Sequence, residues 1–327
     1  MTMMGSKRSH LHDLMAAIIA AVAVLALAHP VAAQPAYPER GLTLIVPYPA
    51  GGGTDTTARL LARDLEIALG KPVTVENRAG GGGWLGWGAL AASQPDGYTI
   101  GYLNVPSLYA GYLDPKVARK ESLDSFTPLT NHVLDYNVWA VKTDSPYKTL
   151  ADVIAAARQT PEKITVTAFG AGGDDHLAIL SIQAETGAKF ATVHMRGTAD
   201  AKSQVLGGHI EVLGANVSEV AEEVRAKQLR VLGVMAPARS RFLPDVPTFK
   251  EQGLNQIWSV SRGVAAPAGL PKDIEAKLIG ALQTILSSPE HQKRADALSL
   301  EVSLVAGDEY RKFLQENEQS TRKLMGW

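Results

Sequence analysis

The chain has 327 residues, with 32 lysines and arginines against 33 aspartates and glutamates, 46% hydrophobic residues and no cysteine. This length suits two domains or one large α/β domain. A formal net charge of −1 gives no general attraction for phosphates, so we expect no nucleic-acid binding. The absence of cysteine excludes disulfides, iron–sulfur clusters, thiolate zinc sites and cysteine nucleophiles.

The first 33 residues have the pattern of a secretory signal peptide. Lys7 and Arg8 form a basic start, and residues 14–28 are fifteen apolar residues without a charge. A membrane span takes about 20 such residues, and residues 31–33 (VAA) supply the small side chains of a cleavage site. We expect cleavage near Ala33 and export to the periplasm; a buried N-terminal helix is the alternative.

Strands and helices are predicted to alternate from residue 42 onward. Residues 42–46 are continuously apolar, as in a strand that is buried on both faces. A helix is expected over residues 56–69 with Gly70 as its stop, and the next strand begins at residues 73–75.

A second alternating series begins at Thr149, which together with Asp152 predicts a capped helix start. Strands are then expected at residues 164–169, 190–194, 210–213 and 230–235, alternating with helices at residues 174–186, 198–206 and 218–226. This alternation indicates parallel sheets with crossover helices.

The last part of the chain is predicted to be helical without further strands. Helices are expected from Pro271 to residue 286, over residues 290–297, and from a cap at Asp308 to residue 324. We expect these helices to cover a sheet that is formed earlier in the chain.

The fold class predicted from this order is α/β, with two doubly wound domains. Residues 37–136 and 259–327 would form the first domain, and residues 137–258 the second. The chain would pass between the two domains twice, near Asn137 and near Trp258, and these two segments would form a hinge.

A glycine-bearing turn, residues 49–55 (PAGGGTD), joins the first predicted strand to its helix. Backbone N–H groups at such a turn, together with the positive end of the helix dipole, can hold an anion. Ligands of open α/β sheets also lie at the carboxyl ends of strands. No Gly-Lys-Ser/Thr follows, so the turn is not a P-loop. A plain connector with Thr54 or Asp55 as the helix cap is the alternative.

A second turn consists of four glycines, residues 80–83, followed by Trp84. Gly81, Gly83 and Gly86 satisfy the spacing G-x-G-x-x-G, but the acidic residue that a dinucleotide site needs about 20 positions later is missing. We interpret this turn as a second backbone wall of the same cleft.

A third turn, residues 170–173, repeats the strand–glycine–helix arrangement and is followed by Asp174 and Asp175. Two such turns, one in each predicted domain, could hold one small ligand from both sides. Because carboxylates repel an anion, we expect this turn to contact a hydroxyl or ammonium group, or to act through water. The first turn would hold the ligand carboxylate. Helix capping is the alternative for each aspartate.

Two further polar residues follow predicted strands. Arg196 comes after the strand at residues 190–194, and its guanidinium suits bidentate binding of a carboxylate. Asn216 comes after the strand at residues 210–213 and would line the cleft. The alternatives are a surface ion pair for Arg196 and a turn for Asn216.

Catalytic patterns are missing from the sequence. The histidines after residue 33 have no metal-ligand spacing, and there is no G-x-S-x-G motif. We predict that the protein is not an enzyme and has no metal or cofactor.

The sequence resembles the substrate-binding receptors of tripartite tricarboxylate transporters, the Bug group, over nearly all of the chain after residue 33. The resemblance is carried by IVPYPAGGGTD (45–55), VTVENRAGGGG (73–83), PDGYTI (95–100), LGGHIEV (206–212), LRVLGVMAPARS (229–240), LPDVPTFKEQGL (243–254) and GVAAPAGLP (263–271). It implies a periplasmic binding protein fold of type II, with two domains around a hinged ligand cleft.

The same resemblance implies a function. A monomeric receptor would capture a small carboxylate, either a di- or tricarboxylate or an aromatic carboxylate. It would deliver this ligand to the membrane permease subunits of a secondary transporter. The alternative is a ligand-sensing receptor that docks on a membrane sensor kinase.

The resemblance also implies ligand contacts. They fall on Tyr48, Ala50, Gly51, Gly52, Thr54, Asp55, Gly82, Gly83, Gly170, Gly172, Asp174 and His176. Arg196 stands where the family commonly has lysine. Trp84 replaces a small polar residue of many members, so it would either stack on an aromatic ligand or pack beside Trp87.

Overall fold

The computed structural model describes residues 37–117 and 119–326. The predicted signal peptide and its cleavage site lie outside these residues. Residues Arg40–Trp327 form one compact unit. In the part of the chain that the structure describes, no helix is both long enough and apolar enough to cross a membrane.

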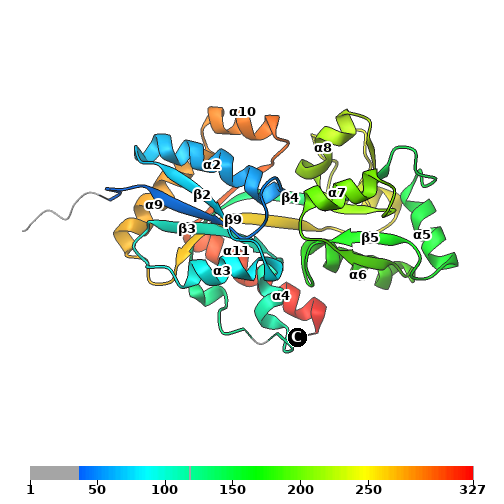
Figure 1. The fold of residues 1–327 in the computed structure, drawn as a ribbon, viewed down its shortest axis with the longest axis horizontal. Coiled ribbons are helices and arrows are strands. Elements are labelled where there is room, and N and C mark those ends of the chain that lie inside the picture. The colour runs from blue at the N-terminus through cyan, green and yellow to red at the C-terminus, as the bar shows by residue number, and fades with distance from the viewer. Residues whose placement is uncertain (1–36, 118, 327) are drawn as a thin grey trace, which may run out of the picture. The chain divides into compact units, whose positions relative to one another are not determined.

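An eight-stranded sheet and a two-stranded sheet organise this unit (Figure 1). The strands are β1 (Leu42–Val46), β2 (Val73–Asn77), β3 (Thr99–Val105), β4 (Phe126–Lys142), β5 (Thr165–Ala168), β6 (Ala191–His194), β7 (Leu213–Asn216), β8 (Leu229–Val234), β9 (Ser259–Pro267) and β10 (Val302–Ala306). The large sheet has the order β10-β4-β9-β3-β1-β2, with β7 and β8 also paired to β4, and the small sheet consists of β5 and β6.

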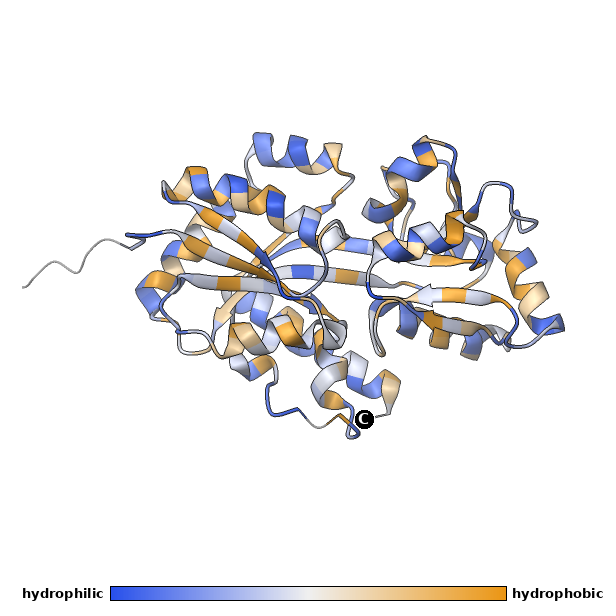
Figure 2. Cartoon of the chain, in the orientation of Figure 1, coloured by the Kyte–Doolittle hydropathy of each residue, from blue (hydrophilic) through white to orange (hydrophobic). Residues whose placement is uncertain are grey.

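Ten helices surround the sheets within the described residues. They are α2 (Gly53–Leu69), α3 (Trp84–Ala91), α4 (Ser107–Leu113), α5 (Leu150–Gln159), α6 (Asp174–Thr186), α7 (Thr198–Leu206), α8 (Val217–Arg225), α9 (Lys272–Leu286), α10 (Pro289–Ala297) and α11 (Gly307–Met325). Helices α2, α9 and α10 pack together, and α3, α4 and α11 pack on the other side of the large sheet (Figure 1). Helix α10 is mostly hydrophilic, whereas the strands of the sheets carry many hydrophobic residues (Figure 2).

Strand β4 is the central element because it changes partners along its length. Its first part, up to Tyr136, pairs with β9, and from Asn137 onward it pairs with β7 and β8. We call β1–β3, β9, β10, the first part of β4 and their helices the first lobe. The last part of β4, β5–β8 and α5–α8 form the second lobe. The predicted division into two domains remains a prediction.

The large sheet is mixed, so the prediction of parallel sheets is correct for only some of its strands. Strands β1, β2 and β3 are parallel, but β9 runs antiparallel to both β3 and β4. The prediction also missed β10, which separates α10 from α11. Strand β10 pairs only with β4 at the edge of the sheet and is half-buried, so it lacks the continuous apolar run of a central strand.

Several helix ends agree with the sequence. Helices α6 and α7 have the predicted bounds, and Thr149 and Asp152 form the predicted capping box of α5. Three predicted positions are wrong. Helix α2 begins at Gly53 rather than residue 56, and α11 is preceded by Ala306 rather than capped by Asp308. Strand β7 covers Leu213–Asn216 rather than residues 210–213.

Candidate ligand-binding pocket

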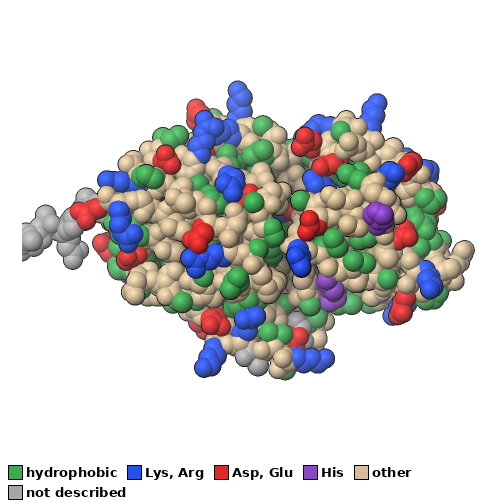
Figure 3. Space-filling view, in the orientation of Figure 1, with side chains coloured by type: hydrophobic (Ala, Val, Ile, Leu, Met, Phe, Trp, Pro, Cys, Tyr) green, Lys and Arg blue, Asp and Glu red, His purple; other side chains and the backbone are tan. Residues whose placement is uncertain are grey.

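A pocket lies between the two lobes, where Figure 3 shows a groove on the face in view. Its volume is about 120 Å³, which is several times the roughly 10–15 Å³ that a cavity needs to hold one water molecule. It is lined by Tyr48, Pro49, Ala50, Gly52, Gly53, Thr54, Asn104, Ser107, Val260 and Arg262 of the first lobe, and by Phe169, Asp174, Asp175, Arg196, Gly197, Thr198, Ala199, Asp200, Asn216 and Glu219 of the second.

Asp55 holds the first glycine turn in shape and does not line this pocket. Its carboxylate accepts hydrogen bonds from the Gly51 N–H at 2.9 Å and from Asn77 Nδ2 at 2.9 Å, and it pairs with Arg59 at 2.9 Å. Burial alone would raise the pKa of Asp55, but these hydrogen bonds lower it. The predicted ligand contact Asp55 is thus not among the residues that line this pocket, and its carboxylate supports the turn. Gly51, another predicted contact, does not line this pocket but lines an adjoining groove.

The amino end of α2 meets a carboxylate from the opposite lobe. The Gly53 N–H donates to Glu219 Oε1 at 3.1 Å, which satisfies one of the free N–H groups at the helix start. A Cβ atom at Gly53 would lie 2.5 Å from an Arg262 nitrogen and 2.6 Å from Glu219 Oε1, so this close approach requires glycine. Neither Thr54 nor Asp55 is the cap: the position belongs to Gly52, and Thr54 Oγ1 accepts from Asn104 Nδ2 at 2.8 Å.

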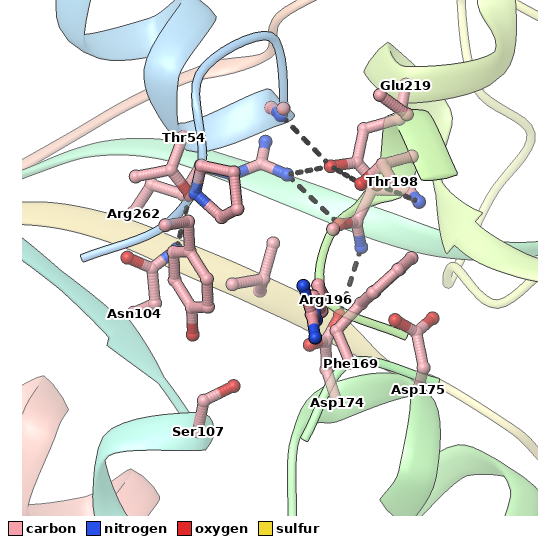
Figure 4. A pocket seen from close by; sticks show the side chains of 18 of the residues that line it. Thr54, Asn104, Ser107, Phe169, Asp174, Asp175, Arg196, Thr198, Glu219 and Arg262 are labelled. Carbon is pink, nitrogen blue, oxygen red and sulfur yellow. Dashed lines mark hydrogen bonds and ion pairs between the residues drawn. The ribbon is translucent and has the colours of Figure 1, made fainter. Parts of the chain in front are cut away.

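Arg262 of β9 is the centre of a buried ionic network (Figure 4). It is 2% exposed and donates to Asp135 Oδ2 at 2.6 Å, Asn216 Oδ1 at 3.0 Å and Glu219 Oε1 at 3.5 Å. Burial alone would lower the pKa of Arg262, but the carboxylates of Asp135 and Glu219 raise it. The guanidinium therefore remains charged, with its charge compensated by these two acids.

Asp174 and Asp175 lie at the start of α6 and are 7% and 3% exposed. Asn137 Nδ2 donates to both carboxylates, at 2.9 Å and 2.7 Å, and Asn216 Nδ2 donates to Asp174 at 3.1 Å. Gly173 holds the cap position, without a side-chain hydrogen bond, so the capping alternative for the two aspartates is wrong.

Arg196 is exposed and faces the same pocket (Figure 4). It follows β6, as the sequence predicts, and forms no ion pair or hydrogen bond with any residue that the structure describes. Its guanidinium is thus available to an anion.

The second and third glycine turns lie against each other beside this pocket. A Cβ atom at Gly170 would be 3.7 Å from Gly82 Cα. Gly82, Gly83 and Gly170 line a neighbouring cavity that also reaches Tyr48 and Arg196. The predicted contacts Gly82, Trp84, Gly170, Gly172 and His176 line a further cavity, to which Arg196 does not belong.

Two predicted contacts in that region serve the packing of the protein. Trp84 is 5% exposed, and its ring makes edge-to-face contacts with Trp87 and Tyr112, at centroid distances of 5.4 and 6.3 Å. It does not line the pocket that contains Arg196 and packs beside Trp87, as in the alternative given above, whereas stacking on an aromatic ligand stays a prediction. His176 Nδ1 accepts from the Gly172 N–H at 2.9 Å, which holds the third turn.

The sequence analysis missed eight polar or aromatic residues of the pocket, which are Asn104, Ser107, Phe169, Asp175, Thr198, Asp200, Glu219 and Arg262, although it named Asp175 as a residue of the third turn. One signal was available. Arg262 is a single charge in an otherwise uncharged segment, residues 256–271, and a charge inside a buried strand needs a partner. Within residues 37–117 and 119–326, no three histidine or acidic side chains are grouped as a metal site requires.

A pocket between two α/β lobes, with polar groups from both, is the arrangement of solute-binding proteins that close around small ligands. Residues 57–326 match the model of the tripartite tricarboxylate transporter family receptor. The chain belongs to this family, whose members are periplasmic receptors and not enzymes. The predicted family, the fold class and the absence of enzymatic function are thereby confirmed.

Individual proteins with similar sequences or structures support this assignment to the family. The protein BugT of Bordetella pertussis is 31% identical over 312 residues, which are 94% of each chain. Two solved structures are similar. Rpa4515 of R. palustris with adipate has a TM-score of 0.83 and 25% identity, over 89% of this chain and 98% of that one. MatC of Rhodopseudomonas palustris with bound malate has a TM-score of 0.81 and 26% identity, over 88% and 99%.

Proposed function

We propose that this protein captures a small carboxylate in the pocket between its lobes and delivers it to the membrane permease subunits of a tripartite tricarboxylate-type transporter. The observation that carries the proposal is Arg196, a cation without a partner among the described residues, in a cavity of about 120 Å³. Malate and adipate, the ligands of two similar structures, are small carboxylates.

The proposed binding residues are the predicted ones that line this pocket. They are Tyr48, Ala50, Gly52, Thr54, Asp174, Arg196 and Asn216. In this arrangement the ligand carboxylate receives hydrogen bonds from the Arg196 guanidinium, and the polar groups of the second lobe contact the rest of the molecule.

We also propose that the lobes are separate domains that close around the ligand. The segments that connect the lobes are joined by three backbone hydrogen bonds. They run from Asn137 N to Trp258 O at 2.9 Å, from Trp258 N to Met235 O at 2.9 Å, and from Met235 N to Asn137 O at 2.8 Å. A hinge near Asn137 and Trp258 would turn about this point. Small-angle scattering should show a smaller radius of gyration with ligand than without, and an unchanged radius would argue against closure.

The binding proposal is tested by calorimetry with malate, adipate and other small carboxylates. Arg196→Ala should weaken binding about ten- to hundredfold, since a hydrogen bond to a charged group contributes about 1.5–3 kcal/mol. Arg63→Ala is the matched control, because Arg63 is exposed on α2 outside the pocket. Equal affinities of the two variants would refute the role of Arg196, and failure of every carboxylate to bind would refute the proposed ligand class.

Delivery to a permease is tested in cells. Loss of the protein should abolish uptake of the carboxylate that it binds, and the Arg196→Ala variant should restore uptake only at raised ligand concentration. Unchanged uptake in cells without the protein would argue against delivery.

A further inference from the structure

We propose that the ligand of this pocket carries a protonated amine in addition to a carboxylate, so that Asp174 and Asp175 bind its ammonium group while Arg196 binds its carboxylate. This inference rests on the proposed function and narrows the class of ligand.

The first argument is the balance of charge in the pocket. Four acidic side chains line it, those of Asp174, Asp175, Asp200 and Glu219, against two cations, Arg196 and Arg262. Arg262 is already paired with Glu219 and with Asp135 behind it. Arg196 alone is left for the ligand, and one guanidinium suits one carboxylate. A second carboxylate on the ligand would meet uncompensated negative charge.

The second argument is the state of Asp174 and Asp175. Both side chains are more than nine-tenths buried, and within the described residues neither has a lysine, arginine or histidine nitrogen at ion-pair distance. Their only side-chain donors are the amides of Asn137 and Asn216, and Asp175 Oδ2 receives no hydrogen bond from a described residue. A buried carboxylate without a cation is unfavourable, and an ammonium group supplies both a charge and three donors.

The third argument is independent of the acids. Asn104 belongs to the first lobe and lines the same pocket at 3% exposure. Its Nδ2 donates to Thr54, but its Oδ1 is buried and has no hydrogen-bond partner among the described residues. This oxygen requires a donor. A dicarboxylate has only acceptors and leaves it unsatisfied, whereas an ammonium group can donate.

The acid pair also predicts how binding responds to pH. Burial, followed by the charges of Asp174 and Glu219, raises the pKa of Asp175, and burial raises that of Asp174. The pair therefore takes up a proton more readily than exposed carboxylates do, and an ammonium group competes with that proton. Affinity for an amino carboxylate should rise with pH, whereas affinity for a dicarboxylate should stay level or fall. The other charged or titratable groups around the pair are Tyr48, Asp135, Arg196, Asp200, Glu219 and Arg262, together with His176, which follows Asp175 on α6, and His194, whose ring contacts that of His176.

The test uses probes that differ in one group. Adipate and 5-aminopentanoate share four methylene groups and one carboxylate, and the second carboxylate of adipate is an ammonium in 5-aminopentanoate. Pentanoate and pentylamine lack one end each. Glutarate, 4-aminobutanoate, butanoate and butylamine repeat the comparison for a shorter chain. Calorimetry on the wild-type protein at pH 5.5 and pH 8.0 gives the affinities.

At pH 8.0 we expect the better of the two amino carboxylates to bind about ten- to hundredfold more tightly than the matching dicarboxylate, the range for a hydrogen bond between charged groups. Its affinity should fall at pH 5.5. Asp175→Asn should remove this advantage of the amino carboxylate over the dicarboxylate. Asp174→Asn should act in the same direction, which provides a second variant if the first one does not fold. Asp144→Asn is the control, because that aspartate is 72% exposed outside the pocket.

The outcomes separate this inference from the proposed function. Dicarboxylates that bind as tightly as the amino carboxylates at both pH values would overturn the inference and leave carboxylate capture intact. An Asp175→Asn variant that keeps the full preference would also overturn it. Binding of pentylamine alone, or of no probe at all, would overturn both.

Discussion

Replacing Arg262 with methionine should destabilise the protein by roughly 3–5 kcal/mol, which is typical for removal of one partner of a buried ion pair. Methionine has a similar length but carries no charge. It would leave Asp135, which is 2% exposed, with no cation. The remaining donors to Asp135 are the Ser218 N–H at 3.2 Å and the Ser218 hydroxyl at 2.5 Å. Glu219 would also lose its contact with the guanidinium.

The measurement is urea unfolding of the ligand-free protein at pH 7.5, followed by tryptophan fluorescence. The slope of the free energy against urea should be the same in all variants, so that a change in midpoint reports stability. Arg239→Met is the matched control. Arg239 pairs with Glu251 at 3.0 Å with both side chains 46% exposed, and such surface pairs contribute about 0–1 kcal/mol.

A second substitution identifies the origin of the loss. Arg262→Met combined with Asp135→Asn should be more stable than Arg262→Met alone, because the unpaired charge is removed with its partner. If Arg262→Met costs no more than Arg239→Met, the buried network does not stabilise the fold as argued. If Asp135→Asn recovers nothing, the loss does not come from the carboxylate of Asp135.

Two further predictions concern the first lobe. Gly263→Ala should lower the free energy of unfolding, measured by thermal melts, by about 1–3 kcal/mol, because the added Cβ atom would lie 1.8 Å from Tyr310 Oη. Gly280→Ala is the control. A Cβ atom at Gly280 meets open space, so this variant should be as stable as the wild type or more stable. His132 and His291 are fully buried with their Nε2 atoms 2.9 Å apart, and burial lowers the pKa of both. Because the unfolded chain binds these protons more readily, the two histidines should destabilise the fold as pH drops from about 7 to 5. His132→Gln should therefore lose less stability than the wild type over that range, whereas His209→Gln, which alters an exposed histidine, should behave as the wild type does. An equal loss in His132→Gln and the wild type would contradict this.

The elements that the sequence predicted best are those with a local signal at both ends. Helix α6 follows a glycine turn and ends at Gly187 in a left-handed conformation, and such ends can be read from neighbouring residues. Strand β4 has no such signal. It is seventeen residues long, and its register is set by β9, β7 and β8, which come later in the chain. Pairing over such distances is not visible in a local pattern.

The same distinction applies to the pocket. Arg196, Asp174 and Asn216 could be predicted because each follows a strand or a glycine turn, where ligands of α/β folds bind. Glu219 and Arg262 lie inside a helix and a strand. The fold brings these two side chains into contact across 43 positions of sequence. A local sequence pattern contains no information on such a contact.

The hydrogen bond from Gly53 to Glu219 makes one helix dependent on the position of the other lobe. Helix α2 has no side chain of its own at its cap, and the carboxylate that serves it belongs to α8. A helix cap contributes about 0.5–2 kcal/mol, so any movement that separates the lobes carries that cost at the start of α2. The Gly53 amide then reports the separation of the lobes, because it is protected while Glu219 is in place and exchanges with solvent when Glu219 leaves.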